Sequence, residues 1–183
     1  LKKDYQTHNF EYIDNAAVSE DGKTIYAFFE NMPLTKIDVQ TGEMSAYENE
    51  DLFSSVGASS SNSIVVSPDG KYVAVGCFDG KVRVIESSSG NVIDEIPEQV
   101  NVSFFMIFTR DSKHLLLQGN DRVVNIRNIE EKCNAGTIDA YEGINNVIFD
   151  DANGVIALCA SRYVYLIENE TFVLVADAVN HGT

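Results

Sequence analysis

The chain has 183 residues, 44% of them apolar, and its 28 acidic against 13 basic residues give a formal net charge of −15. This size allows one hydrophobic core or a run of repeats, and no apolar stretch approaches the ~18 residues that a membrane helix needs. An acidic surface repels a phosphate backbone, so the charge argues against nucleic-acid binding; it keeps a protein soluble and favours a basic protein as partner.

Short apolar runs rich in Val and Ile alternate with polar turns along the whole chain. Four times such a run enters a tight turn and leaves into a second run, and the last apolar residues before these turns are Val18, Val66, Phe108 and Phe149. The steps between them are 48, 42 and 41 residues. Short apolar runs bounded by turn residues indicate an all-β protein. A repeat of about 40–45 residues that contains several strands is typical of a β-propeller blade.

Each repeat is predicted to contain four antiparallel strands. The expected strands are residues 12–18, 24–30, 34–39 and 44–48 in the first repeat, 62–67, 71–77, 82–86 and 91–96 in the second, 103–109, 114–119, 123–128 and 135–139 in the third, and 145–149, 155–160, 163–168 and 172–176 in the fourth. Residues 1–183 are therefore predicted to form a single β-propeller segment, with blades at approximately 12–50, 62–97, 103–140 and 145–177. The serine-rich stretch 52–61 is predicted to be an inserted loop.

The second repeat resembles a blade of the WD-repeat family. The features that carry the resemblance are the turn Ser67-Pro68-Asp69-Gly70-Lys71, the Asp79-Gly80 hairpin and the alternating run Val82–Glu86. Residues 119–128 are a weaker copy of the same pattern. This resemblance identifies the chain as a degenerate WD-repeat-like β-propeller.

The chain departs from the family pattern in two ways. It contains no Trp, so the positions of the family's Trp-Asp pair hold Ile85-Glu86, Arg127-Asn128 and Ile167-Glu168. The family's Gly-His pair is absent from the second, third and fourth repeats, so the hydrogen-bond network of its buried Asp, which Asp79 and Asp121 match, lacks the His partner.

A four-stranded blade exposes two apolar faces and is stable only when it is stacked between neighbours. WD-repeat propellers mostly have seven blades, so the resemblance implies that other blades from the rest of the native chain complete the ring; a small ring of four blades is the alternative. Residues 178–183 are predicted to be the loop that leads into another blade, and residues 1–10 the end of a previous blade.

Nothing in the sequence points to catalysis, a cofactor or a metal. The histidines His8, His114 and His181 are scattered, with His114 predicted at the surface, and there is no phosphate-binding loop or Cys/His metal spacing. The turn at residues 150–154 offers oxygen ligands, but a turn alone explains it. A propeller enzyme or ligand binder would use polar residues around the central channel; the candidates, which also fit turn capping, are Asn101, Asn145 and Asn146.

The loops that join second to third strands and fourth to first strands share one rim of a propeller. The residues predicted there as partner-binding are Met32, Pro33, Phe78, Asp79, Asn120, Arg122, Arg162 and Tyr163; their neighbours on the rim are Asn31, Leu34, Glu98, Gln99, Tyr141 and Glu142. Met, Arg and aromatic side chains anchor protein interfaces. The alternative is that these side chains pack back onto neighbouring blades.

The sequence therefore predicts a non-catalytic protein-interaction scaffold that presents rim loops to a protein or peptide partner in a larger assembly. The odd number of cysteines (Cys77, Cys133 and Cys159) favours reduced thiols in a cytoplasmic protein. No targeting segment is visible at the start of the chain. Glycosylation sequons at Asn101 and Asn169 leave a secreted or cell-surface propeller as an alternative.

Overall fold

The computed structural model describes residues 13–29, 32–48, 64–77, 80–97, 105–119 and 121–179. These residues form sixteen β-strands and no helix, and the strands make four separate antiparallel sheets of four strands each. The all-β class and the four-stranded antiparallel repeats predicted from the sequence are confirmed. No sheet closes into a barrel.

Strands that follow one another in the chain are neighbours in the same sheet. Sheet 1 contains β1 (Ile13–Val18), β2 (Thr24–Phe29), β3 (Thr35–Asp38) and β4 (Met44–Ala46). Sheet 2 contains β5 (Ile64–Val66), β6 (Tyr72–Gly76), β7 (Val82–Glu86) and β8 (Val92–Ile96). Sheet 3 contains β9 (Phe105–Phe108), β10 (His114–Gln118), β11 (Val123–Asn128) and β12 (Cys133–Asp139). Sheet 4 contains β13 (Asn146–Asp150), β14 (Val155–Cys159), β15 (Tyr163–Glu168) and β16 (Leu174–Val179).

The hairpins between first and second strands repeat one set of hydrogen bonds in sheets 1, 2 and 3. In sheet 2, Ser67 Oγ donates to Asp69 Oδ1 over 2.7 Å, and the backbone N–H of Lys71 donates to the same oxygen over 3.1 Å. Asp21 and Asp111 accept the equivalent bonds in the other two sheets. The Ser/Thr-x-Asp pattern closes these turns locally because short polar side chains satisfy the turn's backbone donors.

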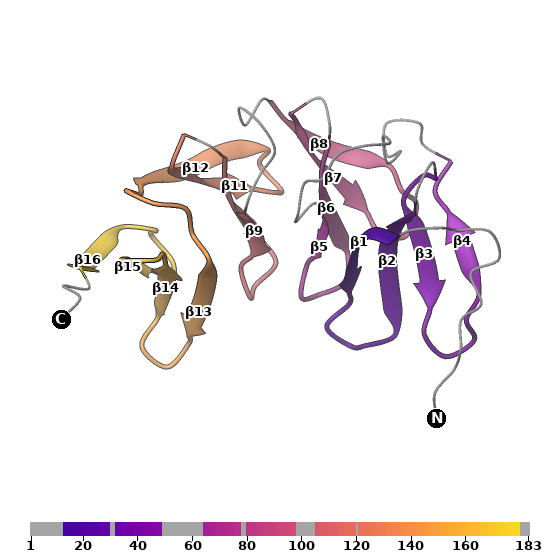
Figure 1. The fold of residues 1–183 in the computed structure, drawn as a ribbon, viewed down its shortest axis with the longest axis horizontal. Helices are drawn as coiled ribbons and strands as arrows, with labels where there is room; N and C mark the ends of the chain where they lie inside the picture. Colours follow the sequence, from indigo (N-terminus) through magenta and orange to yellow (C-terminus); the bar gives the residue numbers. More distant parts are fainter. Residues whose placement is uncertain are drawn as a thin grey trace.

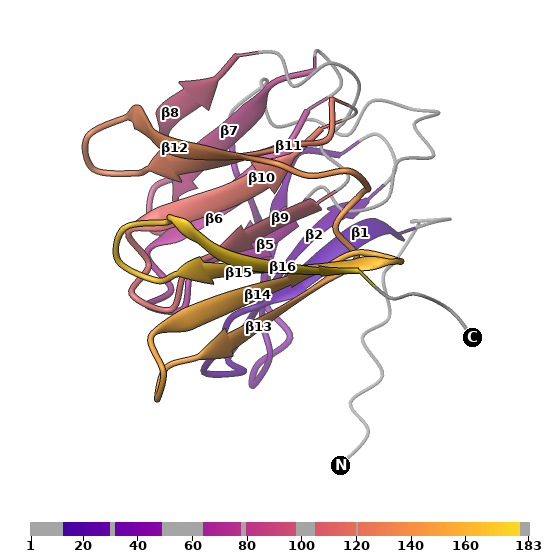
Figure 2. The same cartoon turned by 90° about the vertical axis from the view of Figure 1, so that its left-hand side faces the viewer.

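The four sheets spread like a fan in chain order (Figure 1). The first strand of each sheet lies on the inner side and the fourth strand on the outer side, and β5 contacts both β1 and β9. Figure 2 shows the same stack from its sheet 4 end, with the hairpins between first and second strands gathered on one side.

Apolar side chains fill the space between successive sheets. Between sheets 1 and 2 the buried residues include Tyr26, Phe28, Val73 and Val75. Between sheets 2 and 3 they include Ala74, Val84, Leu115 and Leu117. Between sheets 3 and 4 they include Leu116, Ile126, Ile156 and Leu158. Successive sheets thus bury the faces that they share, as a stack of repeats requires.

The strand registers make equivalent positions in different sheets easy to identify. We call the forward face of a sheet the face that points toward the next sheet in chain order, and the back face its opposite side. The cross-strand row Val65–Ala74–Val84 lies on the forward face of sheet 2, and Ile107–Leu116–Ile126 lies on that of sheet 3. The equivalent row in sheet 4 is Ile148–Ala157–Leu166.

Three details differ from the sequence-based expectations. Residues 178 and 179, predicted to lie in a connection, belong to β16 because they pair with Val164 and Tyr163 of β15. His114 is half-buried rather than on the surface, since its ring packs edge-on against Phe172 of sheet 4 with 4.7 Å between centroids. Asp121, matched to a buried Asp, is exposed and accepts a bond from the N–H of Val123 over 3.1 Å.

Candidate functional site

Three of the predicted partner-binding residues come together at one end of sheets 3 and 4. Arg122 lies in the β10–β11 hairpin, and Arg162 and Tyr163 lie at the β14–β15 hairpin. The β12–β13 connection brings Tyr141 and Glu142 between them, because hairpins after second strands and connections after fourth strands share an end in such sheets. We call these five residues the Tyr141 cluster.

Three tyrosine rings, those of Tyr165 in the core and of Tyr163 and Tyr141 in the Tyr141 cluster, follow one another from the core to the surface. Tyr165 of β15 is buried, with 1% of its surface exposed, and Tyr163 stacks near it with 6.0 Å between ring centroids. Tyr141 packs against Tyr163 at 5.1 Å and is itself 61% exposed. Ring pairs at these distances attract one another. Tyr141 is therefore a large aromatic side chain held in place while most of it faces solvent.

Hydrogen bonds fix the backbone on which Tyr141 stands. Its N–H donates to the hydroxyl oxygen of Tyr165 over 2.8 Å, and its carbonyl accepts a bond from Nη1 of Arg122 over 3.2 Å. Burial raises the pKa of Tyr165, so this hydroxyl stays neutral at physiological pH. Arg122, which donates to the carbonyl of Tyr141, has a left-handed backbone conformation with φ 63°.

Gln118 holds the following residues of the same connection. Its side chain is buried, with 1% of the residue exposed. Its Oε1 accepts a bond from the N–H of Ile144 over 2.7 Å, and its Nε2 donates to the carbonyl of Glu142 over 3.3 Å. The β12–β13 connection is thus tied to sheet 3 by Gln118 and to sheet 4 by Tyr165.

An ion pair joins the connection to the next hairpin. The backbone N–H of Arg162 donates to Oε2 of Glu142 over 2.9 Å, and Nε of Arg162 donates to Oε1 of the same carboxylate. Arg162 holds the pKa of Glu142 below its ordinary value, and Glu142 raises the pKa of Arg162. Because Arg162 is exposed, this pair positions the loop more than it adds stability.

Gln118 and Tyr165 are the functional residues that sequence reasoning missed. Gln118 ends the otherwise apolar run Leu115–Leu117, and a polar residue at the end of a buried strand is a signal that could have identified it. Tyr165 has no such signal, because an aromatic residue in a strand is ordinary core composition.

The other predicted rim residues do not join this cluster. Met32 and Pro33 are half-buried in sheet 1, where Met32 packs against the small core of Ala27, Phe29 and Ile37. Leu34, predicted on the rim, is fully buried at 0% exposure between sheets 1 and 2, because its side chain points into the core. The rim predictions that lie outside the described residues are Asn31, Phe78, Asp79, Glu98, Gln99 and Asn120.

The candidate catalytic and metal-binding residues have ordinary local roles where they are described. Asn145 donates to Ser161 Oγ over 3.3 Å, and Asn146 Oδ1 accepts a bond from the N–H of Val147 over 2.9 Å. Asp150 accepts from both nitrogens of Asn153 within one turn. Within the described ranges no group of three or more His, Cys, Asp or Glu residues could hold a metal ion; Asn101 lies outside these ranges.

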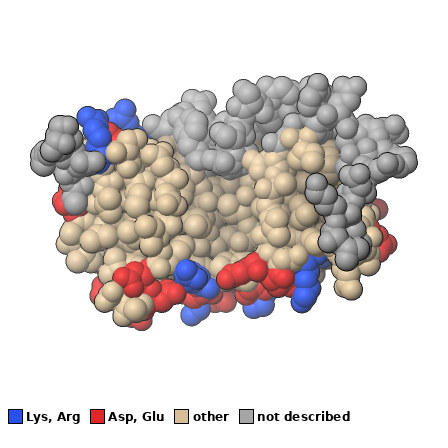
Figure 3. All heavy atoms as spheres, turned by 60° about the horizontal axis from the view of Figure 1, so that its bottom comes forward, with Lys and Arg blue, Asp and Glu red and all other residues tan. Residues whose placement is uncertain are grey.

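The innermost strands form an apolar groove of about 380 Å³. Its wall consists mainly of Val, Ile and Phe side chains from β1, β5, β9 and β13, and its charged members are Glu20 and Arg110 in the hairpin turns. Arg110 lies over the ring of Phe149, 5.5 Å from its centroid. Figure 3 shows this inner side as a broad area without described charged residues, with charged side chains along its lower edge.

No model of a known protein family matches the chain, and no curated protein matches it as a relative. The residues that the structure describes include no helix long and apolar enough to span a membrane. Cys77, Cys133 and Cys159 form no disulfide; Cys77 and Cys159 are half-buried and Cys133 is exposed.

Proposed function

We propose that this chain is a non-catalytic protein-interaction scaffold that binds a protein or peptide partner through the Tyr141 cluster. The observation that carries the proposal is the exposure of Tyr141, at 61%, on a connection fixed by buried Gln118 and Tyr165. A rigid, exposed aromatic side chain loses little entropy on binding, which is why Tyr and Arg dominate interface hot spots. Arg122 and Arg162 supply further donors around it.

The four sheets are, in this proposal, WD-like blades of a larger β-propeller. The forward row of sheet 4 supports this: Leu166 is only partly buried and Ile148 is 54% exposed, whereas Val84 and Ile126 at the position of Leu166 are 0% exposed. An apolar sheet face of this kind needs a covering layer. A further blade from the rest of the native chain would cover it as sheets 3 and 4 cover the sheets before them.

A partner for this surface is a protein, and the net charge of −15 would steer a basic one toward it. We place the scaffold in the cytoplasm, in keeping with three cysteines that form no disulfide. The rival function, a ligand binder or enzyme that uses polar side chains in the central channel, draws less support, since the described innermost strands present an apolar groove.

Peptide selection tests the proposed surface. Peptides chosen from a random display library for binding to the wild-type chain should lose about 30-fold in affinity for Tyr141→Ala, because a hot-spot Tyr is worth about 2 kcal/mol. Lys132→Ala, an exposed residue in the β11–β12 turn at the other end of the sheets, is the matched control and should leave affinity unchanged. Selected peptides that bind Tyr141→Ala as tightly as the wild type would contradict the choice of surface.

A further inference from the structure

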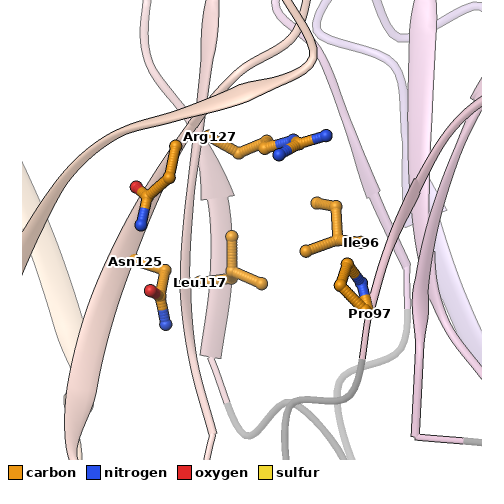
Figure 4. A pocket seen from close by; sticks show the side chains of 6 residues that line it. Ile96, Pro97, Leu117, Asn125 and Arg127 are labelled. Carbon is orange, nitrogen blue, oxygen red and sulfur yellow. The ribbon is translucent and has the colours of Figure 1, made fainter.

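A small cavity lies between sheets 2 and 3, away from the Tyr141 cluster. Its volume is about 160 Å³. Figure 4 shows Arg127 across its top, Ile96 and Pro97 on one side, Asn125 on the other, and Leu117 between them. The sixth lining residue is Asn134 of β12. The cavity thus combines an apolar part with three nitrogen-bearing side chains.

Arg127 occupies a position that is apolar in the other three sheets. By strand register, Arg127 is equivalent to Ile37, Ile85 and Ile167, and these three isoleucines are buried, with 8%, 0% and 0% exposure. All four side chains lie on the back face of their sheets. At this position, therefore, sheet 3 has the guanidinium of Arg127 where the three other sheets have a buried isoleucine.

Asn134, too, stands where the other sheets have apolar residues. Asn134 pairs with Arg127 across the strands, and the equivalent residues in sheets 2 and 4 are Val92 and Leu174. The position of Asn125 holds Thr35 in sheet 1, Arg83 in sheet 2 and Tyr165 in sheet 4, and the ring of Tyr165 fills the corresponding space between sheets 3 and 4. The smaller asparagine leaves that space open between sheets 2 and 3, which accounts for the cavity.

Arg127 is fixed in place by Asp94 of β8. Its Nε and Nη2 each donate to one carboxylate oxygen of Asp94 over 2.8 Å, and the side chain of Asp94 is only 5% exposed. This bidentate pair compensates the charge of the guanidinium and orients it rigidly. Among the described residues, neither Nη1 of Arg127 nor Nδ2 of Asn134 makes a hydrogen bond; Nη1 is not buried, and Asn134 is an exposed residue.

These donors define the chemistry of a ligand. A group that enters the cavity meets N–H donors on the polar side and Ile96, Pro97 and Leu117 on the apolar side. An added carboxylate would stand close to the buried carboxylate of Asp94, and the repulsion between like charges there favours a neutral acceptor. The volume lies below the roughly 300–1,000 Å³ of sites that hold a whole metabolite, so it suits one functional group.

We propose that the cavity between sheets 2 and 3 binds a neutral carboxamide group that carries a short aliphatic chain. The carboxamide oxygen accepts hydrogen bonds from Nη1 of Arg127 and Nδ2 of Asn134, and the aliphatic carbons pack on Leu117 and Ile96. A small amide and the side chain of Gln or Asn in a bound protein share this chemistry. The site is separate from the Tyr141 cluster, so either can fail without the other.

The test is a titration of the ¹⁵N-labelled chain, followed by NMR chemical shifts, with propionamide, with propionate, and with a blocked Gly-Gln-Gly tripeptide. We expect saturable shifts around Asn125 and Asn134 with propionamide at millimolar concentration, and at least tenfold weaker binding of propionate. If the tripeptide binds more tightly than propionamide, the ligand is a side chain of a bound protein. If propionamide binds more tightly, the ligand is a small amide. Either result supports a carboxamide site.

Two variants fill the cavity with residues that other sheets already carry. Asn125→Tyr copies Tyr165 and Asn134→Val copies Val92, so each should fold, and each should weaken propionamide binding at least tenfold. Asn145→Ala, an exposed asparagine elsewhere, is the control and should bind as the wild type does. Equal or tighter binding of propionate, the absence of any saturable shift, or unchanged binding by both variants would overturn the proposal.

Discussion

At the scale of single residues, Gly90 links sheets 1 and 2. It has φ +76°, and a Cβ built on it would lie 2.3 Å from Cδ1 of Tyr47, whose hydroxyl donates to the carbonyl of Ser87 over 2.6 Å. Gly90→Ala adds left-handed backbone strain to a steric clash, so we expect a loss of about 2–4 kcal/mol in the free energy of unfolding. Urea denaturation measures this loss.

Gly22 provides the control for this prediction. It has φ +69°, but no atom lies within 4 Å of a Cβ built on it. Gly22→Ala should therefore cost only the strain of the left-handed conformation, about 1–2 kcal/mol. If the two variants lose the same free energy, the contact between Gly90 and Tyr47 does not contribute to the stability of the interface.

His114 makes the stability of the fold depend on pH. Burial against Phe172 lowers its pKa below the ordinary value of 6.5, although Asp111 opposes the shift. The unfolded chain then binds a proton more readily than the folded chain. The contribution of His114 is complete above pH 6.5 and is lost as the pH falls through 6.5 toward the lower folded-state pKa.

The variant His114→Phe keeps an aromatic ring beside Phe172 and removes the titration. Between pH 7.5 and pH 5.5, the free energy of unfolding should fall more steeply for the wild type than for His114→Phe, as measured by urea denaturation at each pH. If the free energies of unfolding of the two proteins fall in parallel, the folded structure does not disfavour protonation of His114.

At the scale of elements, the third strands show why the sequence predicted the sheets so well. Val82–Glu86, Val123–Asn128 and Tyr163–Glu168 have the predicted bounds. Each is a period-2 run between turns whose Asp, Gly or Ser residues act locally, so neighbouring residues suffice to define it. The end of β16 was missed because Asp177 interrupts the apolar pattern and the strand is continued by pairing with β15.

The candidate site could be predicted only in part, for a physical reason. Arg122, Arg162 and Tyr163 follow from their places in hairpins, which are local features. The bond from Tyr141 to Tyr165 spans 24 residues, the bond from Ile144 to Gln118 spans 26, and the pair Arg127–Asp94 spans 33. Such contacts depend on how the sheets stack, and no sequence period encodes which polar residues will meet.

At the scale of the whole molecule, charge and apolar surface are segregated on the inner side of the stack. The hairpin turns carry acidic and basic residues along one edge, whereas the inner side between the edges is without described charges (Figure 3). Turns tolerate charge because they remain hydrated, and the strands between them must pack. The forward face of sheet 4 carries exposed apolar surface, since Ile148 is 54% exposed and Leu166 is only partly buried.

Ile126 and Leu166 occupy equivalent positions in sheets 3 and 4, and replacing each by Ala should change the free energy of unfolding by different amounts. Ile126 in sheet 3 is fully buried by sheet 4, so Ile126→Ala should cost about 2–5 kcal/mol through the cavity it leaves. Leu166 occupies the same position in sheet 4 but is only partly buried, so Leu166→Ala should cost about 1 kcal/mol or less by urea denaturation. If the two variants lose the same free energy of unfolding, the forward face of sheet 4 is already covered in this chain. In a longer native chain whose next blade packs on sheet 4, the cost of Leu166→Ala should rise to that of Ile126→Ala, because the same side chain would then be enclosed on every side.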